Sequence, residues 1–274
     1  MLVSLLLAVS VATTATGFDK PESAFWDPAT RSWYVSNVSG EENAKDGKGW
    51  ISRLDADGKV VNARWVEGLN SPHGIRIDAE TLYAADIDEL VVVDVPGARV
   101  RARIKAPGAR FLNDVAVGPE GEVYVSDTLA NTIYRCSKAC EVFVKSDALE
   151  APNGLLVDGD RLIVAAWGAI TDEATFATKT PGRLLAVDRK SGKITPLGAG
   201  KPLGNLDGIE KRGTDYLVTD FNAGKLFLVS RSGVATPLKT GLKESADLGY
   251  DPSRNLVGIP EMGPGRVQFL RIAR

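Results

Sequence analysis

The stretch "LEAPNGLLVDGDRLIVAAW", residues 149–167, contains two short apolar runs separated by a polar turn, with an Asn-Gly pair at its head. Apolar residues that alternate around an Asp-Gly turn are typical of an antiparallel hairpin. The Asn-Gly pair alone indicates only a tight turn, because Gly adopts positive φ freely and Asn tolerates it. The same arrangement recurs along the chain, and this repetition decides the fold class.

Six segments follow one plan, in which a polar residue precedes a short apolar run, a turn built on Asp, Gly or Pro, and an alternating strand. They cover residues 21–37, 71–86, 111–127, 151–167, 205–221 and 245–261. Most are followed by further β-prone runs such as "NTIYRCSKA" and "CEVFVKSD". Units of about forty residues with four strands each are typical of a propeller. We therefore predict an all-β chain that forms a six-bladed β-propeller with four-stranded blades.

The N-terminal residues 1–17, "MLVSLLLAVSVATTATG", are apolar from Leu2 to Ala12. This run is too short to span a bilayer but suits the core of a signal peptide, although no basic residue precedes it. We predict a signal peptide over 1–17, cleaved after Ala12 or Gly17, a single propeller over 18–274, and a secreted or periplasmic protein that is not held in a membrane once the signal is removed.

The last repeat ends with its third strand, "RVQFLRIAR". A closed ring needs a fourth strand for this blade, and the β-prone "TTATGF" at residues 13–18 could supply it. That assignment favours cleavage after Ala12 over cleavage after Gly17, because the earlier site keeps these residues in the mature chain.

The charge of the chain is balanced, with 33 basic and 35 acidic residues. Basic residues do not gather in a run interleaved with aromatic residues, so nucleic acid is not an expected partner. Apolar residues make up 44% of the chain and charged residues 25%, which is ordinary for a globular protein and argues against disorder. These properties leave the oligomeric state open.

The two cysteines, Cys136 and Cys140, flank a three-residue turn between two β-like runs. An oxidising compartment would permit a disulfide there, and two free thiols are the alternative. The C-x3-C spacing and the presence of only one histidine, His73, argue against a zinc site. Counting strands from the start of each repeat, where a metal site is predicted below, places this turn on the opposite face of the propeller.

Each repeat begins with a polar residue, and in a propeller these positions converge on the central axis. The six residues are Glu22, His73, Asn113, Asn153, Asp207 and Asp247. Four of them carry carboxylate or amide oxygens, the hard donors that Ca²⁺ prefers. We predict a calcium site made by Glu22, Asn113, Asn153 and Asp207, with Zn²⁺ or Mn²⁺ as possible replacements. The alternative is that these residues only hydrate the channel.

The contexts "PESAFWDP", "NDVAVGPEG", "PNGLLVDGD" and "LDGI" resemble the gluconolactonase and senescence marker protein family, which is related to the paraoxonases and the diisopropylfluorophosphatase-type phosphotriesterases. The resemblance covers essentially the whole mature chain. It implies a catalytic calcium at the centre of a six-bladed propeller, held by the same four residues. "SPHGI" also resembles the paraoxonase segment that carries an active-site histidine, which would be His73 here.

The chain departs from this family at the two residues that follow the ligand Glu22. Many members have Glu-Gly-Pro where residues 22–24 read Glu-Ser-Ala, and the paraoxonases carry a second acid at the position of Ser23. Asp114 matches a residue that the related enzymes use near a second, structural calcium. Without an acid at Ser23, the presence of that second calcium stays open.

Two insertions lengthen the first and fourth repeats, at residues 37–50 and 168–183. Strand direction places both on the same face as the predicted metal. Loops of this length are usually functional or disordered, so we expect them to border the pocket and select the substrate, with surface decoration as the alternative.

These observations predict a calcium-dependent hydrolase of a lactone or small ester. The metal would polarise the carbonyl, and either His73 or Asp207 would activate water as the catalytic base. One alternative is a non-catalytic propeller that binds a protein or glycan, because "VYVSDTLANTIYR" resembles the repeat of NHL-type propellers. Another is organophosphate hydrolysis at the same metal.

Overall fold

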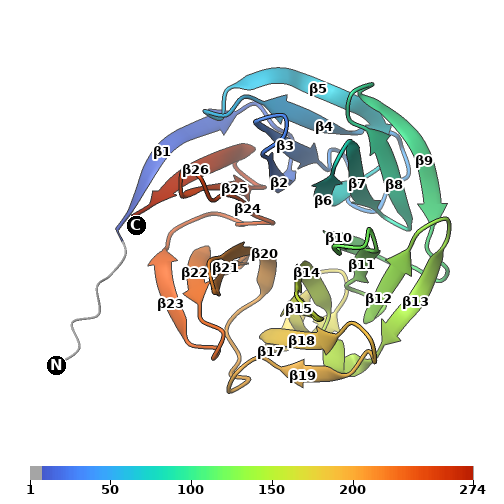
Figure 1. The fold of residues 1–274 in the computed structure, drawn as a ribbon, viewed down its shortest axis with the longest axis vertical. Helices are drawn as coiled ribbons and strands as arrows, with labels where there is room; N and C mark the ends of the chain where they lie inside the picture. The colour runs from blue at the N-terminus through green and yellow to red at the C-terminus, as the bar shows by residue number, and fades with distance from the viewer. Residues whose placement is uncertain (1–7, 274) are drawn as a thin grey trace.

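The computed structural model describes residues 8–273, and six antiparallel four-stranded sheets surround a central axis in it (Figure 1). The predicted six-bladed propeller is therefore confirmed. In each of the first five blades the innermost strand comes first in sequence. Within residues 8–273 the only helical element is the short 3-10 helix Asp147–Leu149. No helix in this part of the chain is long and apolar enough to cross a membrane.

The first three blades use consecutive strands without interruption. Their strands are β2 (Pro21–Asp27), β3 (Ser32–Asn37), β4 (Gly49–Leu54) and β5 (Val60–Leu69); β6 (Pro72–Asp78), β7 (Thr81–Asp86), β8 (Glu89–Asp94) and β9 (Arg99–Lys105); and β10 (Leu112–Val117), β11 (Val123–Asp127), β12 (Thr132–Cys136) and β13 (Cys140–Lys145).

The fourth blade contains an inserted hairpin, and the other two blades complete the ring. Their strands are β14 (Pro152–Asp158), β15 (Arg161–Ala166), β18 (Leu184–Asp188) and β19 (Ile194–Pro196), with the hairpin β16 (Gly168–Asp172) and β17 (Ala177–Pro181); β20 (Leu206–Arg212), β21 (Asp215–Asp220), β22 (Lys225–Val229) and β23 (Ala235–Lys239); and β24 (Gly249–Asp251), β25 (Leu256–Glu261), β26 (Arg266–Ile272) and β1 (Val9–Thr16).

The last blade is completed by the N-terminal strand. β1 pairs with β26 from Val9 opposite Ile272 to Thr16 opposite Arg266, so the chain closes the ring with its own start (Figure 1). The predicted outer strand from the N-terminus is thus present, and it begins earlier than the predicted domain boundary at residue 18. Cleavage after Gly17 would remove all of β1, whereas cleavage after Ala12 would keep its second half. Residues 1–7 of the predicted signal peptide lie outside the described residues.

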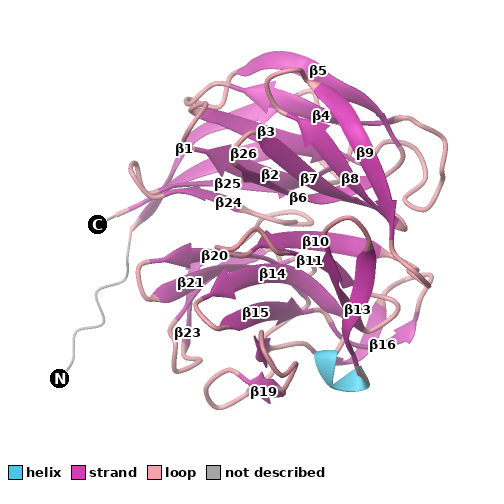
Figure 2. Cartoon of the chain, turned by 45° about the vertical axis from the view of Figure 1, so that its right-hand side comes forward, coloured by secondary structure: helices cyan, strands magenta, loops and turns pink. Residues whose placement is uncertain are grey.

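Neighbouring blades face one another around the axis (Figure 2), and clusters of apolar side chains fill the space between them. The alternating strands dictate this arrangement, because each buried face must meet the face of the next sheet. Ile51 from the first blade and Leu82 from the second belong to one such fully buried cluster. Trp33 and Phe269 join the first and last blades, with ring centroids 5.1 Å apart. The core is therefore a ring of six interfaces.

A disulfide joins Cys136 to Cys140, as predicted, between the end of β12 and the start of β13. β12 starts at Thr132, which pairs with Asp127. The next residue, Thr128, lines the pocket that contains the candidate metal ligands described below. The strand then runs away from that pocket to Cys136. The disulfide accordingly lies at the opposite end of the blade.

Candidate metal centre

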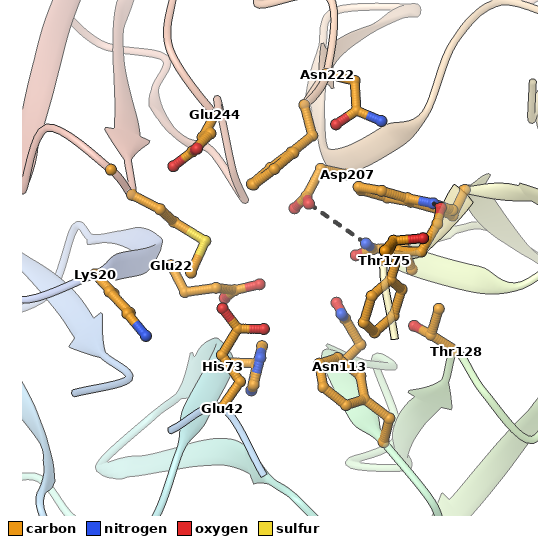
Figure 3. Close-up of a pocket in the computed structure, with 17 residues that line it drawn as sticks. Lys20, Glu22, Glu42, His73, Asn113, Thr128, Thr175, Asp207, Asn222 and Glu244 are labelled. Atoms are coloured by element: carbon orange, nitrogen blue, oxygen red, sulfur yellow. Dashed lines mark hydrogen bonds between the residues drawn. The ribbon is translucent and has the colours of Figure 1, made fainter. Parts of the chain in front are cut away.

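Five of the six polar residues at the starts of the repeats line one pocket of about 400 Å³ at a mouth of the central channel. They are Glu22 on β2, His73 on β6, Asn113 on β10, Asn153 on β14 and Asp207 on β20 (Figure 3). The four predicted metal ligands are 3–5% exposed. The predicted convergence of these residues is therefore observed. The sixth, Asp247, is not among the lining residues and instead accepts a 2.5 Å hydrogen bond from Ser23 Oγ.

A bulge in the innermost strand of each of the first five blades sets the direction of these side chains. Pairing between β2 and β3 jumps from Pro21 to Ala24, so Glu22 and Ser23 have no backbone pairing partner on β3. The pairing of β6, β10, β14 and β20 with their neighbours shifts at the equivalent place. A bulge re-aims a side chain and frees backbone groups from the ladder. Repeating it blade after blade brings the polar residues to the axis.

Hydroxyl groups on the second strand satisfy amides that three of these bulges release. Ser36 Oγ accepts a 2.9 Å hydrogen bond from the amide of Ser23, and Ser126 Oγ accepts one of the same length from Asp114. Thr219 Oγ1 accepts the corresponding 2.8 Å bond from Gly208. A buried amide without a partner costs free energy, so the recurring "VSN", "VSD" and "VTD" sequences help to hold the bulges in place.

Gly154 follows Asn153 because the next blade leaves no room for a side chain. A Cβ at this position would lie 2.1 Å from the carbonyl oxygen of Asp207. Only glycine permits this approach of two backbones without displacement. In the Asn-Gly pair of the fourth repeat, Asn153 is a candidate ligand. Gly154 lets β14 approach β20, the strand that carries the candidate ligand Asp207.

Gly154→Ala is expected to lower the free energy of unfolding by about 1–3 kcal/mol and to weaken metal binding, because the added methyl group pushes against the backbone of Asp207. Thermal unfolding and calcium titration would measure both effects. Gly97→Ala is the control, since its Cβ would meet mainly the mobile end of the Asp94 side chain. Unchanged stability and calcium affinity in Gly154→Ala would contradict this account of the contact.

The four candidate ligands each present one buried oxygen that has no hydrogen-bond partner. These atoms are Glu22 Oε2, Asn113 Oδ1, Asn153 Oδ1 and Asp207 Oδ1. Buried polar atoms are nearly always paired, and an unpaired one is costly. The second polar atom of the Asn153 amide, Nδ2, is engaged, because it donates a 3.4 Å hydrogen bond to Asp207 Oδ2. Four such oxygens around one pocket fit a cation that prefers oxygen ligands.

Two carboxylates and two amides make this donor set. Among residues 8–273, no group of three or more histidine, cysteine, aspartate or glutamate side chains is arranged to hold a metal ion. The candidate centre differs from such a group because half of its donors are neutral amides. Hard, partly neutral oxygen ligands match Ca²⁺ better than Zn²⁺, for which nitrogen and sulfur ligands are usual.

Burial raises the pKa of both carboxylic acids in the set. For Glu22, burial is the main cause and the negative charge of Asp207 adds to it. For Asp207, burial and then the charge of Asp114 raise the pKa to about 8. A divalent cation would reverse these shifts, because it stabilises the charged forms.

The stability gained on adding Ca²⁺ is therefore expected to grow between about pH 4 and about pH 8. The pKa of Asp207 is raised in the folded state, so the folded protein binds more protons than the unfolded protein as the pH rises from about 4 to about 8. Its metal-free stability falls over this range, and Ca²⁺ competes with the proton. Thermal unfolding with chelator or with Ca²⁺ tests this, and a calcium effect independent of pH would contradict it.

His73 lines the same pocket as the four oxygens and is 3% exposed (Figure 3). Its Nδ1 is 2.8 Å from the carbonyl oxygen of Ser71, so Nδ1 carries the proton and Nε2 carries the lone pair. The ring also contacts Phe111, with centroids 4.7 Å apart. Burial lowers the pKa of His73, although the bond to Ser71 opposes this shift. The imidazole is thus neutral and oriented at neutral pH.

A buried positive charge, Arg76 on β6, lies beside Asp114 and lines a second pocket, which contains none of the candidate ligands. Its Nε donates a 3.1 Å hydrogen bond to the carbonyl of Val115, its Nη1 donates to Glu210, and its Nη2 is 3.8 Å from Asp114 Oδ2. The charges of Glu210 and Asp114 raise the pKa of Arg76 against the opposing effect of burial. Sequence reasoning did not assign a role to Arg76, which lies three residues after His73.

The pocket also contains residues from both insertions, as predicted. Glu42 comes from the first insertion, and Thr175 and Phe176 come from the second (Figure 3). Sequence reasoning did not identify four aromatic residues of the lining: one precedes an innermost strand, two follow second strands, and one lies in the turn of the inserted hairpin. They are Phe111, Trp167, Phe176 and Phe221.

Similarity to solved structures agrees with the fold. A gluconolactonase from Xanthomonas campestris superposes with a TM-score of 0.74 at 15% identity, over 97% of this chain and 90% of that chain. This chain shares the fold of a gluconolactonase. The sequence-based resemblance is thereby confirmed at the level of structure, since identities this low show the fold alone.

Lyases with the same fold are also similar. A virginiamycin B lyase from Staphylococcus aureus has a TM-score of 0.67 at 13% identity, over 97% of this chain and 99% of that chain. A streptogramin B lyase has a TM-score of 0.63 at 11% identity, over 97% and 98%. No protein-family model and no functionally curated protein matches the sequence.

Proposed function

We propose that this protein is a calcium-dependent hydrolase of a lactone or small ester. The observation that carries the proposal is the set of four buried, unpartnered oxygens that converge on one pocket. The gluconolactonase among the structural neighbours supports the reaction class. The Cys136–Cys140 disulfide supports an oxidising compartment and hence a secreted or periplasmic location.

Glu22, Asn113, Asn153 and Asp207 would hold the ion. Four side chains leave positions in a shell of 6–8 oxygen ligands, so substrate and water can enter. When bound there, Ca²⁺ supplies a Lewis acid that polarises a carbonyl group and stabilises the negative charge that develops on its oxygen. The four ligand side chains are 3–5% exposed, and charge interactions are stronger in such a buried setting than in bulk water.

His73 is the residue that we assign as general base. Its Nε2 carries the lone pair and its ring is held by Ser71, so it can accept the proton of an attacking water molecule. Asp207 is the other candidate from the sequence. As a metal ligand it would share its charge with the cation and be a weak base, so we assign it to binding the ion.

The test is hydrolysis of a panel of lactones and aryl esters by chelated protein, repeated after Ca²⁺, Zn²⁺ or Mn²⁺ is restored. We expect turnover of at least one lactone that is lost on chelation and returns best with Ca²⁺. His73→Gln should lower kcat strongly while calcium affinity is kept, because glutamine cannot accept the proton. Full activity of His73→Gln at every pH would remove His73 from the mechanism.

Two other results would redirect the assignment. Absence of metal-dependent turnover across the panel would favour a non-catalytic binding propeller of the NHL type. Turnover of an organophosphate triester but of no lactone would keep the metal centre and replace the substrate class.

A further inference from the structure

One side of the pocket is an aromatic wall formed by Phe111, Trp167, Phe176 and Phe221. The four rings form a row in space. Their centroids are 5.3 Å apart for Phe111 and Phe176, 6.1 Å for Phe176 and Trp167, and 5.5 Å for Trp167 and Phe221. Phe111 also contacts His73. The wall is therefore continuous from the proposed base to the fifth blade.

Polar groups on this side donate their hydrogen bonds within the protein. Trp167 Nε1 donates to the carbonyl of Phe176 at 2.9 Å, and Thr128 Oγ1 donates to the carbonyl of Pro152 at 2.9 Å. Asn222 Nδ2 donates to Asn205 Oδ1, also at 2.9 Å. A polyhydroxylated ligand against this wall would bury hydroxyl groups opposite hydrocarbon, which costs free energy for each unpaired group.

The wall is held in place by the inserted hairpin. Phe176, in the turn between β16 and β17, has φ of 53°, a left-handed conformation that is uncommon for an aromatic residue. Arg110 donates two hydrogen bonds to the Glu173 carboxylate, at 3.0 and 2.6 Å, and so ties the hairpin to the third blade. Strained backbone of this kind is typical of ligand clamps.

The facing side of the pocket is acidic. Glu42 and Glu244 line it together with Lys20. Among the described residues that line the pocket, Lys20 is the only lysine or arginine. Lys20 Nζ already donates a 2.7 Å hydrogen bond to the carbonyl of Gly40. A ligand with a negative charge would meet two carboxylates and one engaged ammonium, so this side disfavours anionic substrates.

We propose that the aromatic wall makes the pocket selective for a neutral lactone or ester that carries an aromatic or alkyl group, in preference to a sugar lactone. This inference rests on the proposed hydrolase function and names its substrate class. Phe176 and Phe221 are the specificity-determining residues, because they line the pocket while lying outside the innermost strands that supply the metal ligands.

The test compares kcat/KM of the calcium-loaded protein for dihydrocoumarin and δ-decanolactone with that for glucono-δ-lactone. We expect the two apolar lactones to be preferred. Phe176→Ala and Phe221→Ala should lower kcat/KM for them by about 10- to 100-fold, mainly through KM, because each removes buried aromatic surface. γ-Butyrolactone, which is too small to reach along the wall, should be affected much less.

Controls separate specificity from stability. Phe143→Ala removes an aromatic ring from the outer strand β13, away from the pocket, and should leave the substrate preference unchanged. Phe176→Leu keeps an apolar side chain and provides a milder variant if Phe176→Ala unfolds. Calcium affinity should stay the same in every variant that folds.

The proposal about the aromatic wall and the proposal that the protein is a hydrolase are contradicted by different results. Preference for glucono-δ-lactone, or an equal loss for every lactone in Phe176→Ala, would overturn the wall proposal and leave the hydrolase intact. If no lactone is hydrolysed, calorimetric binding of the lactam analogue 3,4-dihydroquinolin-2-one decides. Binding that Phe176→Ala weakens would support the wall without the hydrolase, and absence of binding would overturn the wall as well.

Discussion

Asp207→Asn is expected to abolish metal-dependent turnover and to weaken calcium binding by roughly 100-fold or more, since even outer-shell partners of metal ligands contribute 10–100-fold. The substitution removes one of the two carboxylates from the candidate centre. It should also stabilise the metal-free protein at about pH 8.5, because a neutral amide no longer has to lose a proton in a buried site. Loss of activity together with a higher Tm without metal is a combination that few other substitutions produce.

The control is Asp215→Asn in the same blade, where the carboxylate lies outside the pocket. It should change neither activity nor the response to calcium. If Asp207→Asn instead binds calcium normally and still loses turnover, Asp207 is the catalytic base rather than mainly a ligand. Retained activity in Asp207→Asn would contradict both roles.

Arg76→Met is expected to lower the free energy of unfolding by about 3–5 kcal/mol, the usual cost of removing one partner from a buried ion pair. The variant leaves Glu210 and Asp114 without their cation, and Asp247 also loses a charge that lowers its pKa. Carboxylates with raised pKa values oppose folding as the pH rises, so the loss should be larger at about pH 8 than at about pH 5.

Arg99→Met serves as the matched control, because Arg99 pairs with Asp94 at 3.4 Å while its own side chain is 76% exposed. An exposed pair contributes at most about 1 kcal/mol. Chemical denaturation of the two variants at both pH values measures the difference. Equal and small effects would show that the buried carboxylic acids stay protonated and do not need Arg76.

The fold was predictable because every blade repeats the same physical signals. A polar residue, an apolar run and a turn recur about every forty residues, and that period is typical of a propeller. The convergence of Glu22 and Asp207 followed from the same repetition, since equivalent positions of a ring meet at its axis.

Other features depend on contacts between distant segments and could not be read from one repeat. Asp247 occupies the position equivalent to Glu22, yet its side chain accepts a hydrogen bond from the hydroxyl of Ser23. The aromatic wall joins residues that precede, follow or interrupt strands of three blades, so no periodicity marks it. The start of the propeller at Val9 is set by pairing with β26, at the other end of the chain.

Calorimetric titration of Ca²⁺ into chelated protein tests the central claim most directly, with Asn153→Ala and Asn222→Ala beside the wild type. Asn153 offers an unpartnered oxygen, whereas Asn222 lines the same pocket with its amide bonded to Asn205. The account predicts a calcium site in the wild type and in Asn222→Ala, and at least about tenfold weaker binding in Asn153→Ala. Absence of calcium binding to the wild type, or equal affinity in all three proteins, would contradict it.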